Sequence, residues 1–204
     1  MLVHGIWMTG FEMALLGRRL RRQGLPPYRF AYSSLRSHPD HSAAALARFI
    51  QRLPEPTVHL VGHSMGGRVI ERLLNQQAGN TLLERIGRVV TLGTPFGGSH
   101  VDRVLCRTRL SGLLVGQARA VLLNSVPEWR HTPPLGVIAG DHGLGIGLIM
   151  PGMPKPHDGT VALCETAIAG ATDRLVVHAA HLPMLASHEV ATQTAHFLHH
   201  GRFA

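Results

Sequence analysis

The sequence is poor in several residue types, and each shortage excludes a class of protein. Aromatic residues make up only 5% of the chain, which leaves no aromatic pattern of the kind that RNA-binding modules use. Charged residues are 16% and apolar residues 45%, a balance typical of a globular protein rather than a disordered one. No apolar segment is long enough to cross a membrane, since the nearest one, residues 135–153, contains Asp141, His142 and several glycines.

Cysteine is also scarce. Cys106 and Cys164 form neither a CxxC motif nor a disulfide framework, and no zinc-ligand spacing is present. Since no signal peptide precedes the first strand, we expect reduced thiols in a cytoplasmic protein. Cys164 lies in an apolar, strand-like run, so we expect it in the core.

Positive charge is abundant, but it is nearly all arginine. The formal net charge is +8, and Lys155 is the only lysine. Four arginines cluster at positions 18, 19, 21 and 22. They indicate either a solvated helix face or peripheral contact with an anionic membrane surface or an acidic partner. We expect no nucleic-acid partner, and the sequence leaves the oligomeric state open.

Apolar periodicity predicts strands and helices in alternation along 204 residues. The expected strands are residues 2–3, 28–33, 57–61, 88–92, 135–139 and 175–178, with a further short extended run at 161–164. The expected helices are residues 10–23, 42–53, 65 to about 77, one or two within 101–126, and 185–200. This order predicts an α/β fold in one domain, residues 1–204, with a mostly parallel central sheet and helices on both faces.

The most specific motif is a G-x-S-x-G pentapeptide, residues 62–66, between an expected strand and an expected helix. That context is typical of a nucleophile elbow, in which a serine occupies the apex of a sharp turn. The glycines at positions 62 and 66 allow strand and helix to approach closely. We therefore expect Ser64 to be a nucleophile at the carboxyl edge of the sheet.

A serine nucleophile needs a base and an orienting acid. His181, in the loop after the last expected strand, is the preferred base, and His178 is its rival. Asp158, before a glycine turn, is the preferred acid, and Asp141 is the alternative. His63 and His188 are expected to be structural.

The oxyanion hole needs two backbone donors. We expect them to be the N–H groups of Met65, after the nucleophile, and of Ile6, after the His-Gly turn that ends the first strand. Trp7, Phe96 and Met184 either line an acyl-binding site or fill the core. The spacing of His178 and His181 is not that of a metalloprotease helix, so we expect no catalytic metal.

Five segments together resemble the α/β-hydrolase superfamily. They are VHGIW (residues 3–7), VGHSMGG (61–67), LGTPFGGS (92–99), DGTV (158–161) and His181. Within the superfamily they are most similar to small bacterial lipases and esterases and to the lipase-like domain of GPI inositol-deacylase. The resemblance implies hydrolysis of a small-molecule ester or lipid through an acyl-enzyme on Ser64, without a cofactor.

The chain differs from larger members of the superfamily at two places. It opens almost directly in its first expected strand, so either the native protein starts upstream of Met1 or the first strands of the fold are missing. Residues 100–134 are short for a lid, although their apolar side chains could cover the site: Leu110, Leu113, Leu114, Val115, Val121, Leu122 and Leu123. An acyltransferase or thioesterase would use the same triad, and a non-catalytic binding protein could keep the fold.

Overall fold

The computed structural model describes residues 1–108 and 111–204, and its centre is a parallel sheet of six strands. The strands lie in the order β2-β1-β3-β4-β5-β6, and every neighbouring pair is parallel. Their bounds are β1 Leu2–Val3, β2 Arg29–Phe30, β3 Val58–His63, β4 Ile86–Leu92, β5 Leu135–Gly140 and β6 Asp173–Val177. All carboxyl ends therefore meet at one edge of the sheet.

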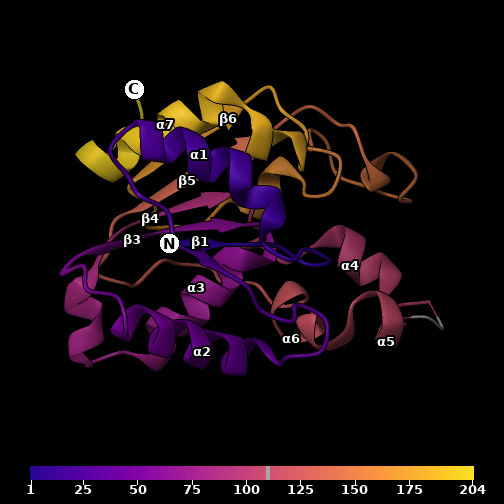
Figure 1. Ribbon diagram of the computed structural model, residues 1–204. Helices are drawn as coiled ribbons and strands as arrows, with labels where there is room; N and C mark the ends of the chain where they lie inside the picture. The colour runs from indigo at the N-terminus through magenta and orange to yellow at the C-terminus, as the bar shows by residue number, and fades with distance from the viewer. Residues whose placement is uncertain (109–110) are drawn as a thin grey trace.

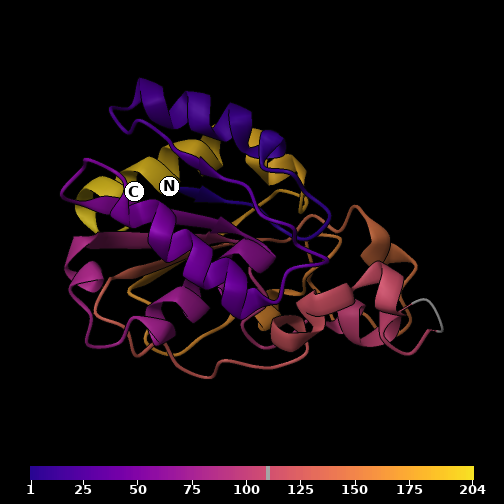
Figure 2. The same cartoon turned by 60° about the horizontal axis from the view of Figure 1, so that its bottom comes forward.

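Helices cover both faces of this sheet, as Figure 1 shows. On one face lie α1, Ala14–Arg22, and α7, His188–His200; on the other lie α2, Pro39–Gln51, and α3, Met65–Gln76. Figure 2 brings the α2 and α3 face forward. Three short helices, α4 (His100–Leu105), α5 (Ser111–Leu114) and α6 (Arg119–Leu122), lie together beyond one end of the sheet.

The alternation of side chains along the strands produces two cores. In β3, Leu60 packs into the cluster under α2 and α3, while its neighbour Val61 packs into the cluster under α1 and α7. The same division separates Val89 from Val90 in β4. Successive strand residues point to opposite faces, so a continuous apolar run is what a sheet covered on both sides requires.

The structure confirms the α/β class and corrects some local predictions. The run expected to be extended at residues 161–164 instead leads into a 3₁₀ turn, Leu163–Thr166, and Cys164 is exposed rather than buried in the core. Helix α2 begins at Pro39, earlier than expected, because the His38 side chain accepts the Asp40 N–H and proline suits the first helical position.

None of the apolar residues of segment 100–134 that could cover the site lines the cavity beside Ser64 in the described part of the chain. Val115, Val121 and Leu122 are buried in the main core, whereas Leu113 is exposed. Leu110 lies outside the described residues. In residues 1–108 and 111–204, no helix is both long and apolar enough to span a bilayer. The cytoplasmic location stays a prediction.

Candidate active site

Ser64 lies at the turn between β3 and α3 with a strained backbone. Its φ is 54° and its ψ is −123°, and Trp7 is the other non-glycine residue with positive φ in the described part of the chain. Such strain persists only where the surroundings impose it. A Cβ at Gly62 would lie 2.6 Å from Gly67 N, and one at Gly66 would lie 2.2 Å from Val3 O. The two motif glycines are therefore required by close packing.

Strand β4 and the loop after it bind both the N–H and the C=O group of Ser64. The Ser64 N–H donates to Leu92 O at 2.8 Å, and Thr94 Oγ1 donates to Ser64 O at 2.9 Å. Thr94 lies so close to α3 that a Cβ at Gly67 would be 2.2 Å from its hydroxyl oxygen. The elbow conformation is thus fixed by a neighbouring strand as well as by its own glycines.

His181 and Asp158 form a buried pair beside the elbow. His181 Nδ1 lies 2.7 Å from Asp158 Oδ2, with side-chain exposures of 8% and 1%. The other carboxylate oxygen accepts the N–H groups of Thr160 and Val161 at 2.9 and 2.7 Å. Burial alone would raise the pKa of Asp158, but the His181 ring and these hydrogen bonds outweigh it and lower the pKa below its usual value. Asp158 is therefore an ionised acceptor for an Nδ1–H.

The rival base and acid are paired with each other instead. His178 Nδ1 lies 2.9 Å from Asp141 Oδ1, and their side chains are 78% and 37% exposed. Neither residue lines the cavity that contains Ser64. The structure therefore brings together the preferred candidates, Ser64 and His181, and separates the alternatives from them.

His63, inside the elbow motif, packs directly against His181. The ring centroids are 4.6 Å apart, and His63 Nε2 lies 3.0 Å from His181 O. A carbonyl only accepts, so Nε2 carries the proton and Nδ1 is left as a buried atom with no partner among the described residues. Burial, then the neighbouring His181, lowers the pKa of His63 to about 3. His63 is therefore a neutral support for the His181 loop.

The loop after β1 lies against the elbow. A Cβ at Gly5 would lie 3.0 Å from Ser64 Cβ, so this position permits the close approach. Next in the loop, Ile6 lines the cavity, and the Trp7 N–H donates to Ser34 Oγ at 3.1 Å. Among the hydrogen bonds outside the helices and strands of the described residues, none uses the N–H of Ile6; Met65 is the first residue of α3, so its N–H has no partner within the helix. Both donors remain available, as an oxyanion hole requires.

His4, at the start of this loop, fixes it against Tyr32. Its ring stacks on Tyr32 with centroids 4.4 Å apart, and the Tyr32 hydroxyl donates to His4 O at 2.8 Å. His4 is fully buried, and burial lowers its pKa. The ring is therefore a neutral structural element rather than a second base.

A cavity of about 200 Å³ opens beside Ser64. Residues from the β1 loop, the elbow and the His181 loop line it: Ile6, Trp7, Met8, Glu12, His63, Ser64, Thr160, His181 and Leu182. Trp7 is therefore at the site, whereas Phe96 and Met184 are fully buried in the core, the alternative that the sequence left open. No hydrogen bond joins Ser64 Oγ to His181 within the described residues, and such contacts often tighten only when substrate binds.

Sequence reasoning missed Glu12. Its carboxylate accepts the N–H groups of Thr9 and Gly10 at 2.9–3.2 Å, and these bonds outweigh desolvation and lower its pKa. The spacing Thr9-x-x-Glu12 is that of a capping box, which could have located the turn but not its place at the cavity.

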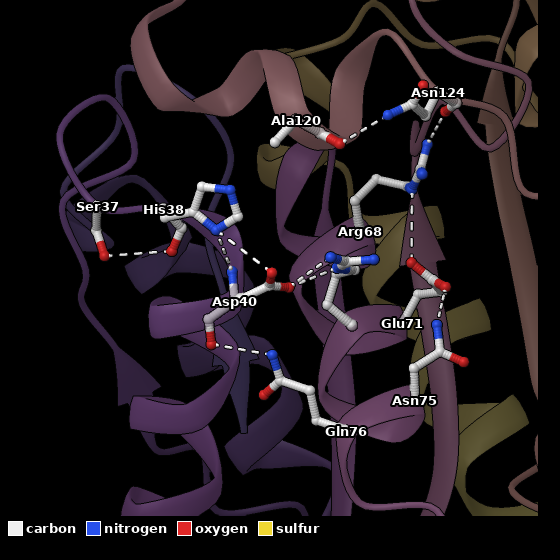
Figure 3. Close-up of polar contacts among 10 residues, drawn as sticks. Ser37, His38, Asp40, Arg68, Glu71, Asn75, Gln76, Ala120 and Asn124 are labelled. Carbon is white, nitrogen blue, oxygen red and sulfur yellow. Dashed lines mark hydrogen bonds and ion pairs between the residues drawn. The ribbon is translucent and has the colours of Figure 1, made fainter.

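Helix α3, which carries the elbow, is tied to its neighbours through polar contacts (Figure 3). The buried Arg68 donates to Pro95 O at 3.0 Å and to Asn124 O at 2.7 Å, linking α3 to the loop after β4 and to the end of α6. Arg72 pairs with Asp40 of α2 at 2.6 Å. These contacts hold the elbow helix against the loop after β4, the end of α6, and α2.

No three histidine, cysteine, aspartate or glutamate side chains converge on a possible metal position in the part of the chain that the structure describes.

Known proteins share this architecture. A family model described as the alpha/beta hydrolase family matches residues 1–117. The mature lipase BlEst2 of Bacillus licheniformis superposes with a TM-score of 0.70 at 18% identity, covering 97% of this chain and 89% of that one. The metagenomic carboxyl esterase MGS0156 gives 0.66 at 18% identity, with 90% and 64% covered. The type II thioesterase BorB from the borrelidin biosynthetic cluster gives 0.59 at 14% identity, with 97% and 89% covered.

At these identities the superpositions establish a shared fold, and no curated protein sequence matches. The family model covers more than half of the chain, and its match includes the β1 loop and the elbow. This chain belongs to the alpha/beta hydrolase family.

Proposed function

We propose that this protein hydrolyses carboxylic esters through an acyl-enzyme on Ser64. The observation that carries the proposal is the shared cavity of Ser64 and His181, with the second imidazole nitrogen of His181 bound to a buried, ionised Asp158 at 2.7 Å. An imidazole fixed in that tautomer presents an unprotonated Nε2 to the cavity, which is what a general base for serine requires.

In the proposed reaction, His181 Nε2 takes the proton of Ser64 Oγ as Oγ forms a bond to the ester carbonyl carbon. The Ile6 and Met65 N–H groups stabilise the carbonyl oxygen as it becomes an oxyanion, each contributing on the order of 3 kcal/mol. The C–O bond to the alcohol then breaks, and His181 returns the proton to the alcohol. Water repeats the sequence, releases the acid and restores Ser64.

The cavity supports an apolar acyl group of modest size. Ile6, Trp7, Met8 and Leu182 provide apolar walls, and the volume of about 200 Å³ is below the range of pockets for drug-sized ligands. We expect a small-molecule ester, or one short chain of a lipid, as substrate.

A thioesterase or an acyltransferase is the second candidate, favoured by the similarity to a type II thioesterase. Both would form the same acyl-enzyme, and they differ in the leaving group or in the acceptor. A binding protein that keeps the fold would need none of the strain at Ser64.

The test uses p-nitrophenyl esters from acetate to palmitate with the wild type and Ser64→Ala. We expect turnover that Ser64→Ala abolishes, with a preference for short chains. Ser125, an exposed serine outside the cavity, provides the matched control variant Ser125→Ala, which should keep full activity. Absence of both turnover and fluorophosphonate labelling at Ser64 would refute catalysis, while labelling without ester turnover would favour acyl transfer or thioester hydrolysis.

A further inference from the structure

Exposed large apolar side chains are concentrated at the edge of the molecule that carries the Ser64 cavity. In the described part of the chain nine such side chains are exposed, and eight belong to segments beyond the carboxyl ends of strands: residues 7–15, 113, 144–149 and 182. These segments lie toward the right of Figure 1. Scattered single exposed apolar residues are normal, but a group on one edge marks an interaction surface.

Four of these residues, Trp7, Phe11, Leu15 and Leu182, form what we call the apolar rim. Trp7 and Leu182 line the cavity and are 47% and 58% exposed. Phe11, 76% exposed, adjoins Glu12, which also lines the cavity; both belong to the 3₁₀ turn Phe11–Met13, and Leu15 follows in the first turn of α1. Helix α1 packs against the 3₁₀ turn Pro183–Ala186, which follows Leu182. The apolar rim therefore borders the mouth of the cavity.

The outer face of α1 continues the apolar rim as a stripe of arginines. Leu15, Arg18 and Arg22 are spaced by three and four residues, which places them on one side of α1, and Phe11 precedes them in the 3₁₀ turn Phe11–Met13. Leu16, Gly17 and Leu20 are buried on the other side. Arg18, Arg21 and Arg22 are exposed and take part in none of the ion pairs found among residues 1–108 and 111–204. We call Arg18 and Arg22, which share the outer face of α1 with Leu15, the arginine stripe.

An anionic lipid bilayer matches both parts of this surface. The apolar rim can insert among the acyl chains, and the arginine stripe can pair with the lipid phosphates. A second copy of this chain fits less well. A two-fold contact through α1 would bring two arginine stripes together in a protein of net charge +8. Glu12, the acidic residue of the cavity, is outnumbered by the arginines on the next two turns.

We propose that the apolar rim and the arginine stripe dock this protein onto an anionic lipid bilayer, with the mouth of the Ser64 cavity facing the lipid. The substrate would then be an ester of the bilayer or one dissolved in it, a part of the inference that rests on the proposed function. Docking itself needs no catalysis.

The experiment measures sedimentation of the Ser64→Ala protein with vesicles, so that hydrolysis plays no role. We expect binding to phosphatidylcholine vesicles that contain about 30% phosphatidylglycerol, weak binding to phosphatidylcholine alone, and a decline as salt rises from about 0.1 to 0.5 M. Binding without ester turnover by the wild type would leave docking intact and refute only the proposed function.

Paired variants separate this surface from net charge. Arg18→Glu with Arg22→Glu should lower the partition coefficient roughly tenfold or more. Arg48→Glu with Arg52→Glu makes the same charge change at exposed positions on and just after α2, across the sheet, and should have a small effect. Phe11→Ser with Leu15→Ser should weaken binding at high salt as well as at low salt.

Three results would overturn the proposal. The first is no binding to the anionic vesicles. The second is an equal loss in the two charge-reversal pairs, which would indicate nonspecific attraction by net charge. The third is a dimer of the Ser64→Ala protein, in light scattering, that Phe11→Ser with Leu15→Ser converts to a monomer, because the apolar rim would then be an interface between copies.

Discussion

Replacing Asp158 by asparagine tests the centre of the proposed site. The asparagine amide oxygen can still accept the N–H groups of Thr160 and Val161, which Asp158 Oδ1 accepts at 2.9 and 2.7 Å, so the turn should keep its shape. The amide nitrogen would then face His181 Nδ1, now 2.7 Å from Oδ2. Two donors cannot share that contact, so the ring would adopt the tautomer with its proton on Nε2.

The expected rise in the activation barrier follows from that change of tautomer. Losing a hydrogen bond to a charged partner costs about 1.5–3 kcal/mol. The wrong tautomer also removes the base, and together we expect a barrier higher by about 4–5.5 kcal/mol, a fall in kcat of about 10³–10⁴-fold. KM should change little, because Asp158 does not line the cavity. The assay is steady-state hydrolysis of a short p-nitrophenyl ester, with thermal melting to confirm folding.

Asp141→Asn is the matched control, since Asp141 also pairs with a histidine, at 2.9 Å. That pair is exposed and outside the cavity, so kcat should stay within about twofold. The reasoning fails if Asp158→Asn keeps near-normal kcat while folded, or if Asp141→Asn loses as much.

Three other changes have defined outcomes. Because the pKa of His63 is about 3 in the folded protein and near 6.5 when unfolded, the unfolded state gains a proton first as pH falls. The free energy of unfolding should therefore fall, through this residue, by up to about 1.4 kcal/mol for each pH unit below 6.5. Urea unfolding of His63→Gln should show a shallower fall with pH than the wild type. The same dependence on pH in both proteins would contradict this. The Glu12 carboxylate lines the cavity and should repel an anionic substrate. Glu12→Gln should therefore raise kcat/KM for a succinate half-ester, relative to that for a neutral butyrate ester, by about two- to fivefold. An unchanged ratio would mean that the Glu12 charge does not act on the bound substrate. Gly66→Ala should cost several kcal/mol in thermal unfolding, because its Cβ would lie 2.2 Å from Val3 O, whereas Gly24→Ala, with φ of 79° and open space, should cost about 1 kcal/mol; equal losses would refute the packing argument.

The sequence was sufficient to predict the layers and the sheet because the strands are continuous apolar runs between amphipathic helices. Ser64, His181 and Asp158 could be named as candidates because a strand-turn-helix motif and chain order constrain them, although the sequence could not exclude His178 and Asp141. Only the structure separates the two pairs, by burying one and exposing the other.

Other features depend on contacts between distant segments. Phe96 and Met184 are apolar residues of the kind that line acyl-binding sites, but both are fully buried in the core. No local sequence pattern distinguishes the two environments. Glu12 reaches the cavity only because the β1 loop folds back over the elbow. The 3₁₀ turn at Leu163–Thr166 takes the place of part of an expected extended run. Glu165 accepts the N–H groups of Ala162 nearby and of His100, and the second of these is a tertiary contact.

The hydrogen bonds to the backbone of Ser64 determine how much of the chain is needed to keep its conformation in another protein. The turn is held by Leu92 O on one side and by the Thr94 hydroxyl on the other, both about thirty residues later in the chain. A pentapeptide copied into another protein would carry its glycines but lose these partners, and the serine would relax into an ordinary turn. A designer who wishes to graft this nucleophile should therefore move residues 58–94 as one piece, with two neighbouring strands and the helix between them.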